Sequence, residues 1–212
     1  MDILLAEREL KKRHIYPYKW RQLQNNSFDR RTNFIYNTLL FDDLLSAIKD
    51  LFFDDTDYEL YFDYCLNRWY NFWSAKAIEK IFCLQETVIP AENSKDKFLD
   101  FYINKTPFDL KMTVFPKAYE QYYTQVQNDP LPLIKWLYEN QSQQNRKHLS
   151  NRLFLVLHNQ NGEHWKLKAE IQWLSNIVQN YVENFQNQNL YQLELTKGKT
   201  TLSDLIFARK CS

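Results

Sequence analysis

Two aspartates and a lysine are the residues of this sequence whose types and spacing could support chemistry. Asp100 precedes the dipeptide Asn104-Lys105, Asp109 follows it, and Lys111 lies two residues beyond Asp109. The surrounding stretch FLDFYINKTPFDLKMTVFP, residues 98–116, alternates between apolar and polar residues on both sides of that dipeptide. Such alternation is typical of β-strands, so a hairpin here would bring the three charged side chains together.

The register of this hairpin follows from a two-residue turn at Asn104-Lys105. Counting outward from that turn pairs Ile103 with Thr106, Tyr102 with Pro107, Phe101 with Phe108, and Asp100 with Asp109. Residues directly opposite each other in a non-hydrogen-bonded pair have Cβ atoms about 4.5–5.5 Å apart. Two carboxylates roughly 5 Å apart repel by about 3 kcal/mol at an effective dielectric constant near 20, so we expect a cation between them.

The chemistry that fits this pair of acids is binding of a hard divalent cation. Asp100 and Asp109, with the backbone carbonyl of Leu110, supply the oxygen ligands that Mg²⁺ prefers, and Mn²⁺ is expected to substitute. Lys111 shares the face of Asp109 because side chains on a strand alternate with a period of two. The opposite face is expected to be apolar core, formed by Leu99, Phe101, Phe108, Leu110 and Met112.

Two alternatives to a cation site stay open. In the first, the charges form the solvent-exposed face of the hairpin, and Lys105 and Lys111 screen the acids. In the second, the turn lies elsewhere in the stretch, and the two aspartates never meet.

The elements that must position the hairpin follow from the apolar pattern along the chain. We expect a helical region over residues 1–57 with one helix at 34–52, a long helix at 58–84, the hairpin, helices split at Asp129-Pro130, a strand at 152–159, a helix at 166–185, a strand at 190–196, and a turn at Gly198 before the tail. This order predicts an α/β fold, with a small mixed sheet around the central hairpin and helices on its flanks. Residues 1–57 would pack on a core of 58–212 within one domain.

The composition of the sequence limits which binding partners and which cellular compartment we expect. The net charge is +1, so no global basic field indicates nucleic acid. Basic residues gather at 8–31 and acidic residues at 42–63; either run could be a solvated helix face, and the basic run could also supply a local positive field along a cleft. Three widely spaced cysteines favour a reduced compartment, and the longest strongly apolar run, residues 153–157, is too short to cross a bilayer. We therefore expect a cytoplasmic protein without membrane contact.

The acid on the first hairpin strand, followed by Asp109-Leu110-Lys111 on the second, resembles the PD-(D/E)xK nuclease superfamily, which has the restriction-endonuclease-like fold. The resemblance covers about residues 70–160 and includes a helix before the hairpin and a helix-strand unit after it. It implies that the two acids hold Mg²⁺ and that Lys111 positions or activates the attacking water. The chain departs from the family pattern because Leu99 stands where the motif has proline, and because the acids are closely spaced.

The resemblance also implies an acid on the helix that precedes the hairpin. Glu79 is the first candidate and Glu86 the second, although Glu79 could equally form a surface pair with Lys76. A polar cluster before the strand at 152–159 could contact phosphates or could be a solvated helix end. Its members are Gln143, Gln144, Arg146, Lys147, His148 and Arg152.

These observations favour a Mg²⁺-dependent nuclease that hydrolyses phosphodiester bonds in DNA. Asp100 and Asp109 would bind the metal, and Lys111 would orient the water. The alternative is a non-catalytic scaffold of the same fold that binds protein or nucleic acid through its aromatic helices. The chain has neither a G-x-x-x-x-G-K nor a G-x-G-x-x-G motif, so a nucleotide-cradling loop is not expected. A homodimer is compatible with all of these features.

Overall fold

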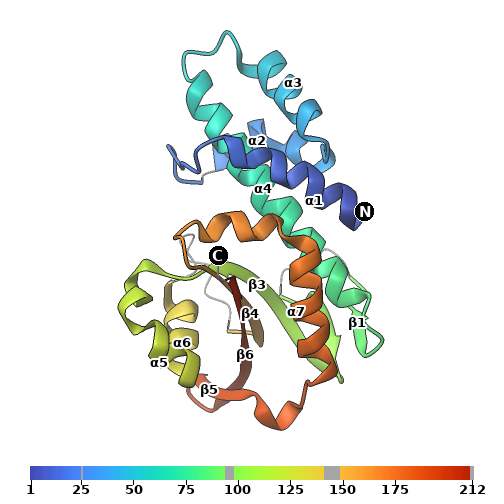
Figure 1. Ribbon diagram of the computed structural model, residues 1–212, viewed down its shortest axis with the longest axis vertical. Coiled ribbons are helices and arrows are strands. Elements are labelled where there is room, and N and C mark those ends of the chain that lie inside the picture. The colour runs from blue at the N-terminus through green and yellow to red at the C-terminus, as the bar shows by residue number, and fades with distance from the viewer. Residues whose placement is uncertain (25, 94–97, 141–148, 211–212) are drawn as a thin grey trace. The chain divides into compact units, whose positions relative to one another are not determined.

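The fold is mixed α/β, as expected from the sequence. The computed structural model describes residues 1–24, 26–93, 98–140 and 149–210, and within these residues the strands form one six-stranded sheet. The chain divides into two units, one made of residues 1–78 with 168–173 and the other of 79–167 with 174–212. The first unit is helical, whereas the second contains the sheet (Figure 1).

The α-helices and strands have the following bounds. The α-helices are α1 (Ile3–Lys12), α2 (Asn26–Arg31), α3 (Phe41–Phe52), α4 (Tyr58–Cys83), α5 (Tyr123–Asn128), α6 (Leu131–Asn140) and α7 (Ile171–Glu183). The strands are β1 (Val88–Pro90), β2 (Phe101–Ile103), β3 (Thr106–Val114), β4 (Arg152–Asn159), β5 (Tyr191–Thr196) and β6 (Lys199–Lys210).

Three parallel strands form the centre of the sheet, which has the order β1-β2-β3-β4-β6-β5. Strand β4 pairs in parallel with β3 on one side and with β6 on the other, whereas β1, β2 and β5 are antiparallel to their neighbours. The interior of β4 is buried on both faces, as the continuous apolar run of its sequence predicts. The long parallel strand β3 therefore anchors the hairpin to the core.

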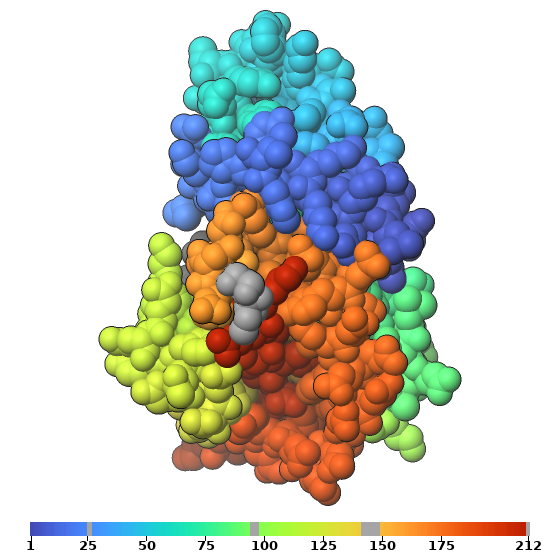
Figure 2. All heavy atoms as spheres, in the orientation of Figure 1, coloured from blue at the N-terminus to red at the C-terminus, as the bar shows by residue number. Residues whose placement is uncertain are grey.

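Helices cover both faces of the central strands. On one face, Leu133, Ile134 and Leu137 of α6 pack in a core cluster with Phe154 and Val156 of β4. On the other face, the Tyr181 hydroxyl of α7 donates to the Asp204 carboxylate of β6 at 2.8 Å. Figure 1 shows α5 and α6 on one side of the sheet and α7 on the other, and Figure 2 shows the atoms of β6 (dark red) between these two groups.

Most of the expected elements are confirmed, and four differ. The helix expected at 166–185 is shorter, because residues 164–169 form a 3₁₀ helix and α7 begins only at Ile171. The helix expected at 34–52 begins only at Phe41, because residues 33–37 form a separate turn of 3₁₀ helix. The tail after Gly198 is the strand β6, which lies beside β4. The short strand β1 was not expected, and it extends the hairpin into a three-stranded antiparallel ribbon.

The basic and acidic runs of the first unit pair with each other. Lys12 contacts Asp42, Arg21 contacts Asp63, and Arg31 contacts Asp55, with N···O distances of 2.5–2.9 Å. The uneven charge distribution along the sequence is therefore partly compensated in space. The cations of these pairs stay partly exposed, so the pairing adds to the expected solvated faces and does not replace them.

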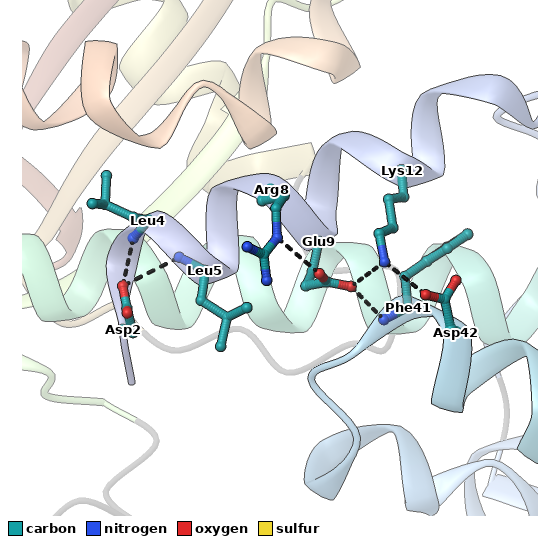
Figure 3. Close-up of polar contacts among 8 residues, drawn as sticks. All are labelled: Asp2, Leu4, Leu5, Arg8, Glu9, Lys12, Phe41 and Asp42. Carbon is teal, nitrogen blue, oxygen red and sulfur yellow. Dashed lines mark hydrogen bonds and ion pairs between the residues drawn. The ribbon is translucent and has the colours of Figure 1, made fainter.

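A buried glutamate organises the first of these contacts. The Glu9 side chain is nearly inaccessible, and it accepts from the Phe41 backbone N–H at 2.9 Å and contacts the Lys12 ammonium at 2.9 Å (Figure 3). The Arg8 guanidinium approaches the other Glu9 oxygen at 3.3 Å. Burial opposes ionisation, but these donors outweigh it and lower the pKa of Glu9. The N-terminal cations thus hold helices α1 and α3 together.

Two histidines meet at the carboxyl end of β4 in the second unit. The ring centroids of His158 and His164 are 4.9 Å apart, and the Tyr123 ring lies 4.2 Å from that of His158. Burial is the main cause that lowers the pKa of both histidines. The charges of His164 and Arg209 lower the pKa of His158 further, whereas Glu120 raises both. Both rings are therefore mainly neutral at pH 7.

We expect this histidine pair to make the protein less stable as the pH falls below 6.5, the ordinary pKa of histidine. In that range the unfolded chain takes up protons on both rings, whereas the folded chain resists until its lowered pKa values are reached. Urea unfolding at about pH 7.5 and about pH 5.5 measures the drop, which His158→Phe should reduce because phenylalanine does not titrate. An equal drop in the variant and the wild type would contradict this account.

No helix among the described residues is long and apolar enough to span a bilayer.

Candidate active site

The hairpin that carries the candidate residues forms as the sequence predicts. Its turn residues Asn104 and Lys105 have φ values of 45° and 67°, the left-handed conformation that a tight two-residue hairpin turn requires at both positions. Asparagine adopts this conformation more readily than lysine. The observed pairs are Phe101↔Phe108, Tyr102↔Pro107 and Ile103↔Thr106, which confirms the predicted register.

Asp100 differs from the prediction because it lies just outside β2, where the strand pairing has ended. Its backbone N–H donates to the Phe108 carbonyl at 2.9 Å, and its carboxylate Oδ2 accepts from the Leu110 N–H at 2.7 Å. We expected Asp100 and Asp109 to face each other as a non-hydrogen-bonded pair of the hairpin. Instead, the backbone bends at Asp100. At this bend the Asp100 carboxylate, rather than a backbone carbonyl of a neighbouring strand, accepts the hydrogen bond from the Leu110 N–H of β3.

Asp109 is almost completely buried, with 1% of its surface exposed, and it contacts two cations. The Lys111 ammonium lies 2.5 Å from Oδ1, and the Arg152 Nε lies 3.1 Å from Oδ2. Arg152 reaches Asp109 because the two residues are partners in the parallel pairing of β3 with β4. The ring of Tyr138, on α6, covers the Arg152 guanidinium at 5.2 Å.

Arg152 is the residue of the site that sequence reasoning misplaced. We expected it in a phosphate-contacting cluster, whereas its side chain is buried and bound to Asp109. The other members of that cluster, at 143–148, lie outside the described residues. A signal was available in the sequence, since a charged residue that opens a buried apolar strand needs a partner in the core.

The two acids influence each other electrostatically. The pKa of Asp100 is raised, mainly by burial and in part by the negative charges of Asp109 and Glu79, while the Leu110 N–H and Lys111 oppose the rise. Glu79 of α4 thus lies near enough to interact with Asp100. Glu86 is exposed in the turn after α4, and it is not among the groups that shift this pKa.

We refer to Asp100, Asp109, Glu79, Lys111 and Arg152 as the acid cluster. Burial raises the pKa of Asp100 first, and the charges of Asp109 and Glu79 raise it further, so an ionised Asp100 carboxylate is costly at this position. An added cation would relieve that cost. A partly buried acid with a raised pKa beside other charged side chains is typical of a functional site.

The oxygen donors near Asp100 fit a Mg²⁺ ion with few protein ligands. The Leu110 N–H points toward Asp100, and in a strand the carbonyl of a residue points to the same side as its N–H, so the Leu110 oxygen faces the same edge. No group of three or more His, Cys, Asp or Glu side chains within the described ranges is arranged to hold a metal. An ion here would therefore keep several waters, as Mg²⁺ commonly does.

Comparison of the chain with models of known protein families, with curated proteins and with solved structures finds no match.

Proposed function

We propose that this protein is a Mg²⁺-dependent nuclease that hydrolyses phosphodiester bonds in DNA, on a restriction-endonuclease-like fold. The observation that carries the proposal is the position of Asp100. Its carboxylate is fixed to the Leu110 N–H beside Asp109 and Lys111, and burial, together with the charges of Asp109 and Glu79, raises its pKa. The order of elements also supports the proposal, because α4 precedes the hairpin and a helical region followed by the parallel strand β4 comes after it.

In this proposal Asp100, Asp109 and the Leu110 carbonyl hold the ion. A bound Mg²⁺ would polarise the phosphoryl group and favour ionisation of a bound water. Arg152 contacts the Asp109 carboxylate and fixes its orientation from the buried side. The Lys111 side chain, about one-third exposed, is accessible to water and to a phosphate oxygen, so it can orient the nucleophile and balance developing charge.

One observation favours the alternative, a non-catalytic scaffold of the same fold. Both oxygens of Asp109 already contact cationic side chains, so the structure is electrostatically complete at this residue without an ion. In that case the acid cluster would serve stability, and any function would lie on another surface.

Incubation of plasmid and single-stranded DNA with Mg²⁺ or Mn²⁺ tests the proposal. We expect wild-type protein to cut DNA and Asp100→Asn to be inactive, because the amide removes a metal-binding charge but still accepts from the Leu110 N–H. Calorimetry with Mg²⁺ should detect an ion bound by the wild type and lost in the variant. Absence of both cutting and ion binding in the wild type would exclude the nuclease and favour the scaffold.

A further inference from the structure

A pocket beside the outer strands β1 and β2 lies apart from the residues of the proposed chemistry. Its volume is about 480 Å³, within the range of pockets that bind small organic groups. Ile89, Pro90 and Leu99 form an apolar wall, and Tyr102 and Lys105 add an aromatic ring and an ammonium group. The pocket therefore combines a stacking surface with a positive charge.

The pocket opens on the accessible face of the β1–β2 ribbon. Ile89 and Tyr102 are cross-strand partners, and Ile89 is 60% exposed. Their neighbours Val88 and Ile103 are also partners, and both are buried on the opposite face. The Tyr102 side chain thus lies on the opposite face of the ribbon from Val88 and Ile103, on the same face as the exposed Ile89.

Of the acid cluster, Asp109 and Lys111 have side chains on this same face of the sheet. Tyr102 lies opposite Pro107, and Asp109 follows Pro107 by two residues, so both side chains are on one face about 7 Å apart along the strand direction. The pocket residue Leu99 is also the chain neighbour of Asp100. A polymer that reaches Asp100 and the partly exposed Lys111 can therefore extend toward the pocket.

We propose that this pocket binds an unpaired base of single-stranded DNA, next to the phosphodiester held at the acid cluster. The inference rests on the proposed nuclease function and adds the substrate class. The base stacks on the Tyr102 ring, and Lys105 neutralises an adjacent phosphate. Glu92 disfavours a phosphate at its end of the pocket.

The pocket selects single strands because the bases of a duplex are already stacked and paired. A duplex base would have to leave the helix before it could enter, and this costs free energy that an unpaired base does not spend. The net charge of +1 is consistent with this mode, since stacking supplies affinity that does not depend on a large basic surface.

Fluorescence anisotropy with a labelled oligothymidylate tests the inference in EDTA, where metal-dependent hydrolysis is absent. We expect the wild type to bind the single strand at least about tenfold more tightly than a blunt duplex of the same length. Tyr102→Ala should weaken single-strand binding by about 5- to 150-fold, whereas Tyr102→Phe, which keeps the stacking ring, should stay close to the wild type. Tyr122→Ala, at an exposed tyrosine on another element, is the matched control and should have no effect.

The outcomes separate this inference from the nuclease proposal. Unchanged single-strand binding by Tyr102→Ala, equal binding of single strand and duplex, or no single-strand binding by the wild type would overturn the pocket assignment, even if DNA is cut with Mg²⁺. Tyr102-dependent binding without any cutting would retain the pocket and reject the nuclease. A circular dichroism spectrum of Tyr102→Ala that matches the wild type shows that the fold is intact.

Discussion

Replacing Asp109 with alanine is expected to lower the free energy of unfolding by about 3–5 kcal/mol, which is typical when one partner of a buried ion pair is removed. Arg152 is 5% exposed, and the substitution leaves its guanidinium in the core without the Asp109 carboxylate. Urea unfolding followed by tryptophan fluorescence or far-ultraviolet circular dichroism measures the change at neutral pH. A loss below about 1 kcal/mol would show that the pair contributes little.

The matched control removes both charges together. Asp109→Leu combined with Arg152→Met replaces the pair with apolar side chains, and this double variant should recover most of the stability lost in Asp109→Ala. If the double variant is no more stable than the single one, the loss comes from packing rather than from an unpaired buried charge. Under the nuclease proposal neither the single nor the double variant should cut DNA, because both lack the carboxylate proposed to bind the metal.

This dual role of Asp109 affects how the nuclease proposal must be tested. An inactive Asp109→Ala protein could be inactive because its core is disrupted, so that variant does not by itself identify a metal ligand. Asp100→Asn and substitutions at Lys111 are better tests, since Asp100 lies at the end of a strand and Lys111 is about one-third exposed.

The parts of the fold that the sequence predicts are those set by local rules. The hairpin register depends on a two-residue turn and on alternation within a few residues, and both are visible in the sequence. The strand β4 was found with its bounds because a short, fully apolar run between polar residues has few other interpretations. In contrast, β1 has three residues and ends at Pro90, which gives almost no periodic signal.

The parts that the sequence does not predict depend on pairing between distant segments. Strand β6 alternates only weakly, and it becomes a central strand because it lies beside β4, more than 40 residues earlier in the chain. Arg152 meets Asp109 for the same reason, since only the parallel register of β3 with β4 places them opposite each other. The charge runs of the first unit also pair across 24–42 residues, so neither run reveals its partner locally.

The candidate site combines features that the sequence predicts with one that it does not. Asp100, Asp109 and Lys111 were brought together by the hairpin as expected, whereas the bend at Asp100 was not foreseen. It arises because the Asp100 carboxylate binds the Leu110 N–H, and side chains of this type commonly replace backbone partners where a ladder ends. The pattern of residues therefore predicts which acids converge, but the structure is needed to show what each oxygen contacts.

Replacing Lys111 with methionine is expected to reduce the rate of DNA hydrolysis by about 10²- to 10⁴-fold, the range typical for loss of a group that handles a proton or orients the nucleophile. Stability should change by less than about 1 kcal/mol, because Lys111 is about one-third exposed and Arg152 continues to balance the Asp109 charge. Initial rates of plasmid cleavage at saturating Mg²⁺, together with urea unfolding of the same samples, measure both quantities.

The control for this prediction separates a local role from a general effect of positive charge. Lys135→Met removes an equal charge from an exposed position on α6, and it should leave the rate within about twofold of the wild type because exposed charges are well screened. Lys111→Arg keeps the charge but changes the donor geometry, so we expect only partial activity. If Lys111→Met cuts DNA as fast as the wild type, the lysine only neutralises Asp109, and the water must be oriented by another group of the site.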